Sequence, residues 1–506
     1  MATFSNAQRL ITADYNHVKG PLNTFFKECI GAGRANEGLR ADWQKQLAFV
    51  KKECGFEYIR MHGLLHDDMG IVYKEDKNGN AIYNWNYIDL LYDYLLSIGM
   101  KPFVELSFMP SALASNKQTV FWWKGNISYP KNETAWYKLI NELVKHLTQR
   151  YGKQEVAKWY FEVWNEPNLK DLFFAGTMQD YFKLYALTAK AVKDADAGYK
   201  VGGPATAGSG WITEFIDYCS TNKVPVDFVA THTYGVKNGF VDLDGQRGHI
   251  IDNKYSSLYS EVISTKNKIT QSALPALPLH YTEWSSSYSS RDPIHDSYHQ
   301  CAYILDKLKN TGDAVNSMSY WVFTDIFEEN GPGATPFHGG FGLLNNDGIT
   351  KPAFYAYQYL NKLGATELNN SDKASWVCKS ASGNVQVLLW DFTITHPGDS
   401  VNNETYYKRD LPSKRKGHTS ISLKNIPSGN YRLNIYKTGY GANDAYTAWY
   451  KMGSPIFPTP EQISTLKQEN NGKPALSSVV HINDGIFKKD ISINENDVYL
   501  IDLIKQ

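Results

Sequence analysis

Between residues 25 and 363, predicted strands alternate with predicted helices, and this alternation restricts the fold more than any other feature. Short apolar segments give eight predicted strands: Phe25–Ile30, Phe56–Met61, Lys101–Leu106, Tyr160–Trp164, Lys200–Gly203, Val226–Thr231, Leu279–Thr282 and Val315–Val322. Segments with apolar residues three or four positions apart give helices between them, including Trp43–Cys54, Ile88–Ile98, Trp136–Tyr151, Asp180–Val192 with Asp180 as N-cap, and Tyr355–Leu363. Strands separated by helices pair in parallel, and eight such units close into a barrel. We therefore expect an α/β chain built on a (β/α)8 TIM barrel.

An open, doubly wound sheet is the alternative fold for the same alternation of elements. The sequence has no GxGxxG loop after a predicted strand, which lowers this alternative for nucleotide chemistry. With 506 residues, the chain is also long enough for a large domain and at least one smaller one.

The pattern changes beyond Gly364. Further strand-like segments lie between turn sequences, at Val385–Thr393, Thr419–Leu423, Tyr431–Tyr436 and Val498–Ile504, with one short helix predicted at Glu461–Lys467. We expect a barrel domain over residues 21–364 and an all-β, sandwich-like domain over residues 365–506. Residues 1–20 form an N-terminal segment that we expect to join the β domain as an edge strand.

The charges of the chain balance, with 52 basic and 52 acidic residues, so nothing electrostatic favours nucleic acid or an anionic membrane as partner. Five cysteines, odd in number and far apart, indicate buried free thiols. Because no apolar run is long enough to span a membrane, we expect a soluble protein. The sequence leaves open a homo-oligomer. It also leaves open a cytoplasmic location or export to the periplasm or exterior after removal of a signal peptide.

The residues that end the predicted strands are candidates for one common site, because the carboxyl ends of barrel strands open on the same face. The residues that end five of these strands are Arg60 and His62, Asn165 and Glu166, His232 and Tyr234, Glu283, and Trp321. Together they predict a polar and aromatic ring around one opening.

Two glutamates stand out in this ring. Glu166 follows an apolar strand and precedes Pro167, so its carboxyl is held on a rigid support beside an apolar wall that could raise its pKa for use as a general acid. Glu283 ends the seventh predicted strand. Glycoside hydrolysis needs two carboxyl groups that flank the scissile bond, about 5 to 5.5 Å apart in retaining enzymes. An ordinary loop carboxylate is the simpler interpretation of either glutamate alone, but the pair favours catalysis.

Several motifs resemble glycoside hydrolase family 39, the β-xylosidase and α-L-iduronidase family of TIM-barrel clan A, and most closely its bacterial β-xylosidases. These motifs are Gly31-Ala-Gly-Arg-Ala35, Tyr58-Ile-Arg-Met-His-Gly63, Glu162-Val-Trp-Asn-Glu-Pro-Asn168, His232-Thr-Tyr234, Tyr281-Thr-Glu-Trp284, Ser319-Tyr-Trp-Val-Phe-Thr-Asp-Ile-Phe-Glu-Glu329 and Phe337-His-Gly-Gly-Phe-Gly-Leu-Leu344. The resemblance implies a retaining double displacement without a cofactor, with Glu166 as acid/base, Glu283 as nucleophile and a β-sandwich packed on the barrel.

The resemblance also implies supporting roles. Asn165 would bond the 2-hydroxyl of the sugar, while Arg60 and Tyr234 would keep the nucleophile ionised. Trp321 would form the floor of the subsite, and His62, His232 and one of Glu328 and Glu329 would bond sugar hydroxyls.

The expected substrate is a neutral glycoside, since the loop after the eighth strand carries acidic residues where a uronate would need a cation. The resemblance implies release of the terminal, non-reducing β-D-xylose of xylo-oligosaccharides. Two alternative functions stay open. The chain could use the same mechanism on another pentoside or hemicellulose side chain, such as an arabinoside, or it could be a catalytically silent sugar-binding protein.

A metal-dependent hydrolase is the rival from another class. The histidine pairs His62/His66, followed by Asp67 and Asp68, and His295/His299 have the spacing of helical metal ligands. Neither pair has the glutamate of an HExxH motif, so we expect no metal.

Overall fold

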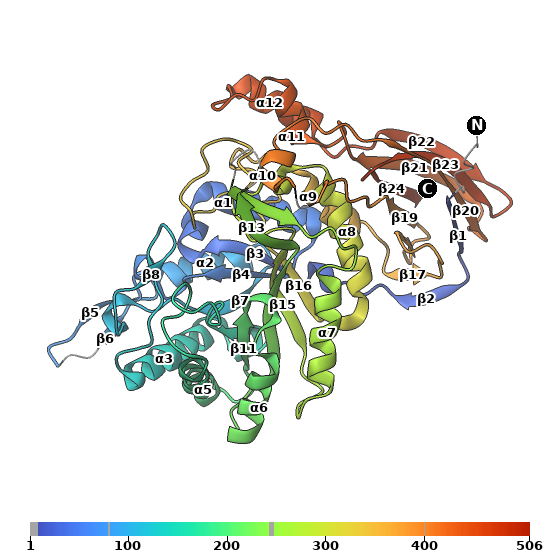
Figure 1. Cartoon of the computed structure of the whole chain (residues 1–506). Coiled ribbons are helices and arrows are strands. Elements are labelled where there is room, and N and C mark those ends of the chain that lie inside the picture. Colours follow the sequence, from blue (N-terminus) through green and yellow to red (C-terminus); the bar gives the residue numbers. More distant parts are fainter. Residues whose placement is uncertain (1–8, 79–80, 242–246, 399) are drawn as a thin grey trace.

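The computed structural model describes residues 9–78, 81–241, 247–398 and 400–506, and the first eight residues of the predicted N-terminal segment lie outside them. Eight parallel strands form a closed barrel, as predicted (Figure 1). In chain order they are β3 (Cys29–Arg34), β4 (Tyr58–His62), β7 (Lys101–Leu106), β10 (Tyr160–Val163), β11 (Lys200–Thr206), β12 (Phe228–Tyr234), β15 (Leu279–Ser285) and β16 (Ser317–Tyr320). The closed barrel excludes an open, doubly wound sheet.

One longer helix follows each barrel strand. These helices are α1 (Ala41–Cys54), α2 (Asn86–Ser97), α3 (Glu133–Tyr151), α5 (Met178–Ala195), α6 (Ile212–Asn222), α7 (Tyr259–Thr270), α8 (His299–Thr311) and α9 (Pro352–Asn361), with the short α4 (Lys153–Val156) before β10. Small hairpins extend three strand ends: β5 (Val72–Glu75) with β6 (Ala81–Tyr83), β8 (Thr119–Val120) with β9 (Gly125–Asn126), and β13 (Val236–Val241) with β14 (Arg247–Ile251). The buried faces of helices and strands share one large apolar core.

Several predicted boundaries are wrong by two or more residues, and two of them have a clear physical reason. The segment Phe25–Lys27 forms a 3-10 turn, and the first barrel strand begins only at Cys29. Phe25 and Phe26 are buried, so their apolar character reflects packing and not strand pairing. Asp180 is not the N-cap of α5, because Thr177 holds that position and the two residues form a reciprocal capping box.

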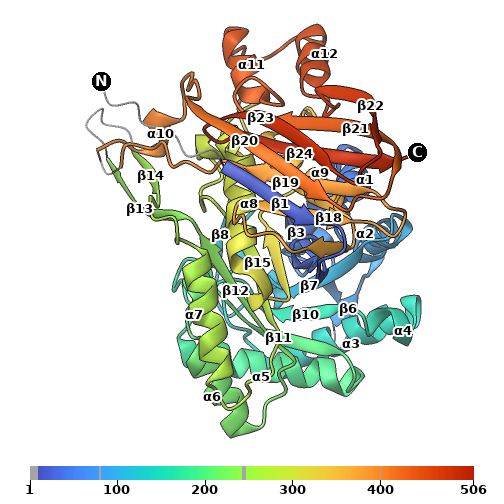
Figure 2. The same cartoon turned by 90° about the vertical axis from the view of Figure 1, so that its right-hand side faces the viewer.

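The C-terminal region adds two further sheets. The seven-stranded sheet has the order β2 (Val18–Pro21), β17 (Thr366–Leu368), β18 (Ser375–Lys379), β19 (Val385–Trp390), β24 (Val498–Lys505), β21 (Gly429–Thr438) and β22 (Leu476–Ile482). The three-stranded sheet has the order β1 (Arg9–Asp14), β20 (Arg415–Lys424) and β23 (Phe487–Asn494). Figure 2 shows β1, in blue, among orange and red C-terminal strands, so the N-terminal residues contribute an edge strand to each sheet.

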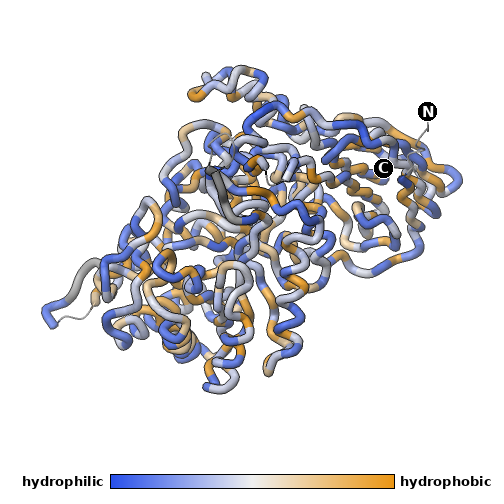
Figure 3. The backbone as a smooth tube through the Cα atoms, in the orientation of Figure 1, coloured by the Kyte–Doolittle hydropathy of each residue, from blue (hydrophilic) through white to orange (hydrophobic). Residues whose placement is uncertain are grey.

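An apolar cluster of its own joins the two sheets. Its members include Ile11 from β1, Val387 from β19, Ile421 from β20 and Ile501 from β24, all nearly inaccessible to solvent. Figure 3 shows apolar residues recurring along these strands. The region is not purely β, because it also contains α10 (Asn403–Tyr406), α11 (Ala445–Lys451) and α12 (Pro460–Glu469). The predicted helix at Glu461–Lys467 corresponds to α12.

All five cysteines are buried and none forms a disulfide, as expected. Among the residues that the structure describes, no helix is long and apolar enough to cross a membrane.

Truncating Ile11 tests whether β1 contributes to this second core. Ile11 is 0% exposed and the adjacent Leu10 is 56% exposed, so the two residues form a matched pair on one strand. Ile11→Ala should lower the free energy of unfolding by about 2 to 5 kcal/mol, because it removes buried methyl groups and leaves a cavity. Leu10→Ala should change it by less than about 0.5 kcal/mol. Urea denaturation measures both, and equal effects of the two variants would contradict this packing.

Candidate active site

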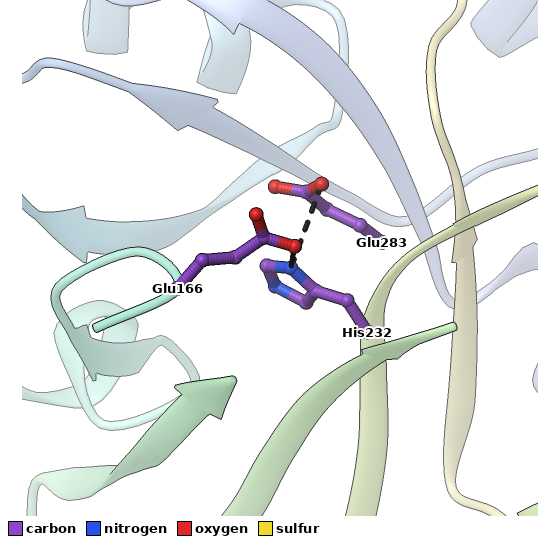
Figure 4. A group of neighbouring side chains, drawn as sticks. All are labelled: Glu166, His232 and Glu283. Carbon is purple, nitrogen blue, oxygen red and sulfur yellow. Dashed lines mark hydrogen bonds and ion pairs between the residues drawn. The ribbon is translucent and has the colours of Figure 1, made fainter. Parts of the chain in front are cut away.

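The predicted site residues converge at the carboxyl ends of the barrel strands. Glu166 follows β10, His232 lies on β12 and Glu283 lies on β15, and Figure 4 shows their side chains pointing toward one another. One oxygen or nitrogen atom from each of the three residues lies within 4.8 Å of the others. Two carboxyl groups that are 117 positions apart in the sequence therefore face each other across a gap of atomic size.

The backbone around Glu166 is held in an unusual conformation. Trp164 and Glu166 have φ angles of 73° and 43°, in the left-handed region that residues other than glycine rarely adopt. Hydrogen bonds to the end of β11 and the residue after it hold the turn. Glu166 N–H donates to Ala205 O at 2.7 Å, and the Asn168 amide makes two bonds to Ala207. Such strained conformations persist where the surroundings fix them, often at functional sites.

Arg60 lies at the centre of the site and is completely buried. Its Nη1 donates to Glu283 Oε1 at 2.6 Å, its Nη2 contacts Glu105 Oε2 at 2.7 Å and Asn165 Oδ1 at 3.0 Å, and its Nε donates to Glu162. These contacts fix the carboxylate of Glu283 and the amide of Asn165 relative to one another.

Glu283 has a second donor on its other oxygen. Tyr234 O–H donates to Glu283 Oε2 at 2.7 Å. Burial and the neighbouring carboxylate raise the pKa of Tyr234, so the phenol keeps its proton and acts as a donor. A cation and a neutral hydroxyl therefore both stabilise negative charge on Glu283.

Glu166 lies in a different environment. Burial raises the pKa of Glu166 to about 7, although His62 and Arg60 oppose the shift. Its hydrogen-bonding neighbour is His232, whose Nδ1 lies 2.9 Å from Glu166 Oε1. Burial lowers the pKa of His232 to about 3, so this imidazole is neutral and supplies no charge that would ionise the glutamate. Glu166 can therefore keep its proton near neutral pH.

His62 carries the second positive charge of the site. Burial lowers its pKa, but the carboxylates of Glu105, Glu329 and Glu283 outweigh burial and raise it to about 10. Its Nδ1 lies 2.7 Å from Glu105 Oε2, and its Nε2 lies 3.4 Å from Glu329 Oε1. The ring of Trp321 is 4.6 Å from the imidazole, which places this aromatic side chain on the same wall.

The two glutamates of the loop after β16 differ in their contacts. Glu329 lies beside His62, and burial raises its pKa to about 7. Glu328 has both carboxylate oxygens in ion pairs, with Arg34 at 2.6 Å and Arg40 at 3.2 Å. Of the two, Glu329 is the one that contacts the residues around Glu166 and Glu283.

Two buried carboxylates of the site were not predicted from the sequence, Glu105 on β7 and Glu162 on β10. Both pair with Arg60, and Glu162 also accepts a hydrogen bond from the Thr282 hydroxyl at 2.7 Å. Burial raises the pKa of Glu162 to about 7, with Arg60 opposing. A charged residue within each apolar strand was the available signal, because a buried carboxylate needs a partner.

Within each of the two histidine pairs considered as metal ligands, the two imidazole rings contact different partners. His66 contacts Asp68 at 2.8 Å, whereas His62 faces Glu105. The rings of His295 and His299 bond separate partners, Gly339 O and the Thr395 hydroxyl. Within the described ranges, the one carboxylate and histidine group with metal-like spacing is Glu166, His232 and Glu283.

Comparison with known proteins identifies the family to which the chain is similar. The sequence profile described as Glycosyl hydrolases family 39 matches residues 9–485. The chain is 41% identical over 495 residues to a β-xylosidase from Caldicellulosiruptor saccharolyticus, and the alignment covers 97% of each protein.

Two solved structures are similar over almost their whole lengths. One is the GH39 enzyme from Xanthomonas axonopodis pv. citri, with a TM-score of 0.96, 40% identity and coverage of 99% of this chain and 98% of that one. The other is a monomeric β-xylosidase from Caulobacter crescentus CB15, with a TM-score of 0.95, 40% identity and coverage of 98% and 99%. The barrel, the facing carboxyl groups and these matches agree, and the chain belongs to glycoside hydrolase family 39 and is a glycosidase.

Proposed function

We propose that this chain is a retaining β-xylosidase that removes the terminal xylose from the non-reducing end of xylo-oligosaccharides, as in xylan degradation. The observation that carries the proposal is the spacing of Glu166 and Glu283, whose facing oxygens lie within 4.8 Å of each other. Retaining glycosidases separate their carboxyl groups by about 5 to 5.5 Å, whereas inverting enzymes need about 6.5 to 9.5 Å to admit a water. The similarity to named β-xylosidases supports the choice of sugar.

In the first step, Glu283 is the nucleophile and Glu166 is the general acid. A Glu283 oxygen attacks the anomeric carbon while the bond from that carbon to the leaving oxygen breaks. Glu166 transfers its proton to the departing oxygen, so the aglycone leaves as a neutral alcohol. Arg60 and Tyr234 hold Glu283 in its anionic form, and burial keeps Glu166 protonated.

In the second step, Glu166 is the general base. Its carboxylate removes a proton from water as the water oxygen attacks the anomeric carbon, and the ester bond to Glu283 breaks. The product is xylose with its original anomeric configuration, and both glutamates return to their starting protonation states.

Other side chains would hold the sugar. Asn165 accepts from Arg60 through its carbonyl oxygen, which leaves its amide N–H groups for the 2-hydroxyl. We propose that His62, His232 and Glu329 bond further hydroxyls and that Trp321 forms the floor. Glu328 is instead committed to Arg34 and Arg40, so we assign it to holding the loop.

We also propose that residues 21–364 form the catalytic barrel domain and that residues 365–506 form an accessory β-sandwich domain, joined by the segment 1–20. Support comes from the separate apolar cluster shared by the two C-terminal sheets, which includes residues of β1.

A panel of 4-nitrophenyl glycosides tests the substrate. The β-D-xyloside should give the highest kcat/KM, above the arabinoside, galactoside, glucoside and glucuronide. A higher value for the arabinoside would favour the alternative pentoside activity. No hydrolysis of any member, with binding retained, would favour the silent sugar-binding protein and contradict the proposal.

Substitution of Glu166 and Glu283 by Gln, and by Ala in the presence of azide, tests the two catalytic roles. Each variant should lose turnover of an unactivated xyloside by at least about a thousandfold, because one step lacks its acid or its nucleophile. With an activated aryl xyloside, azide should rescue Glu166→Ala as the β-xylosyl azide and Glu283→Ala as the α-xylosyl azide. Proton NMR distinguishes the two products, and the reverse assignment would exchange the two roles.

The pH dependence of kcat/KM should reflect the proton on Glu166. Because burial raises its pKa to about 7, the acid form is present below that pH, and activity on an unactivated xyloside should fall about tenfold per unit above it. Glu329 has a pKa in the same range and is the matched control. The Glu329→Gln variant should keep the fall in kcat/KM above pH 7, which is the alkaline limb of the profile. The Glu166→Gln variant, assayed on an activated xyloside, should lose this limb. Loss of the limb only in Glu329→Gln would contradict the assignment.

A further inference from the structure

A second cavity lies outside the catalytic cluster. It has a volume of about 420 Å³, and its lining includes Arg291, Phe337, Glu404, Tyr446, Trp449 and Tyr450. None of the proposed catalytic or sugar-binding residues lines it. Its size and its mixture of aromatic and charged side chains are typical of small-molecule sites, which often lie where separate parts of a fold meet.

Four separate parts of the chain form the walls of this cavity. Arg291 comes from the loop after β15, Phe337 from the loop after β16, and the other residues named above from α10 and α11. The helix α10 packs beside β14, where a Cβ on Gly248 would lie 2.9 Å from Glu404. The hairpin β13–β14 follows β12 directly, so α10 reaches the barrel face on which the catalytic residues lie (Figures 1 and 2).

The side chain of Arg291 connects the cavity wall to the loop after β16, which carries Glu329. Arg291 Nη2 donates to Gly331 O at 2.7 Å, two residues after Glu329. Its Nη1 donates to Ser290 O at 2.8 Å. The cavity is therefore next to the loop that carries Glu329, but on a wall that the catalytic cluster does not use.

The lining offers both kinds of contact that a sugar needs. Phe337, Tyr446 and Trp449 belong to one buried apolar cluster beneath the cavity, and Tyr450, which is 38% exposed, is the aromatic side chain most open to a ligand. Flat aromatic faces of this kind are suited to packing against the C–H groups of a pyranose, while rim charges can bond its hydroxyls.

The charges at the cavity are only partly neutralised within the protein. Glu404 and Lys408 form an ion pair with each other at 2.5 Å. Arg291, in contrast, donates to backbone carbonyls and makes no close ion pair in the described part of the chain, and Asp325 and Glu329 act on its charge only from a greater distance. Its positive charge thus stays available to an oxygen-rich ligand.

We propose that this cavity is a second saccharide-binding site, which holds a sugar unit of an oligosaccharide outside the catalytic pocket. The choice of a saccharide follows from the aromatic lining in a chain that is a glycosidase. The choice of a xylose-based probe rests on the proposed function.

Calorimetric titration with xylotriose tests the site in the double variant Glu166→Gln/Glu283→Gln, which should bind without turnover. We expect two binding sites per chain. Adding Tyr450→Ala should weaken one of them at least tenfold, and adding Thr335→Trp, which fills the cavity from another wall, should have the same effect. Tyr87→Ala, an exposed tyrosine on α2, is the matched control and should leave both sites intact.

One binding site in the double variant, or two sites unaffected by both Tyr450→Ala and Thr335→Trp, would overturn the proposal. The proposed catalytic function is measured separately, in the chain that retains both Glu166 and Glu283. There, the Tyr450→Ala variant should hydrolyse 4-nitrophenyl β-D-xyloside within twofold of the native rate. An inactive native chain would contradict the proposed catalytic function, but it would leave the number of binding sites in the double variant unchanged.

Discussion

The buried guanidinium of Arg60 is the contact on which the catalytic arrangement depends. It is inaccessible to water and touches the carboxylates of Glu105, Glu162 and Glu283 at once. Buried carboxylates are costly without a partner. Removing Arg60 would leave Glu162 without a cation beside it, and it would leave Glu105 and Glu283 with His62 alone. Arg60 therefore links strands β4, β7, β10 and β15 at their carboxyl ends, and it fixes the nucleophile candidate in the process.

The two facing glutamates have different neighbours. Glu283 has a cation on one oxygen and a phenol donor on the other. Glu166 has a neutral imidazole beside it, so burial raises its pKa without a direct ion pair to reverse the shift. Two chemically identical side chains can thus serve as nucleophile and acid, because the barrel places them on different strands.

The sequence was informative wherever local pattern decides structure. Buried parallel strands appear as short apolar runs, and their ends placed Arg60, Glu166, His232 and Glu283 on one face. Contacts between distant positions were not predictable: Arg34 and Arg40 hold Glu328, which leaves Glu329 beside His62. Glu105 lies outside the recognised motifs and Glu162 opens one of them, but the sequence signal for their pairing with Arg60 was only a charged residue within an apolar strand. Helices α10 and α11 are too short to show an apolar periodicity, so the second cavity could not be predicted.

The most direct measurement is identification of the residue that becomes covalently attached to sugar. Treating the enzyme with 2,4-dinitrophenyl 2-deoxy-2-fluoro-β-D-xyloside should slow the second step enough for the intermediate to accumulate. Mass spectrometry of peptides should then find one fluoroxylosyl group per chain, on the peptide containing Glu283. Label on Glu166, on Glu329 or on no residue at all, in an enzyme that hydrolyses xylosides, would contradict the account.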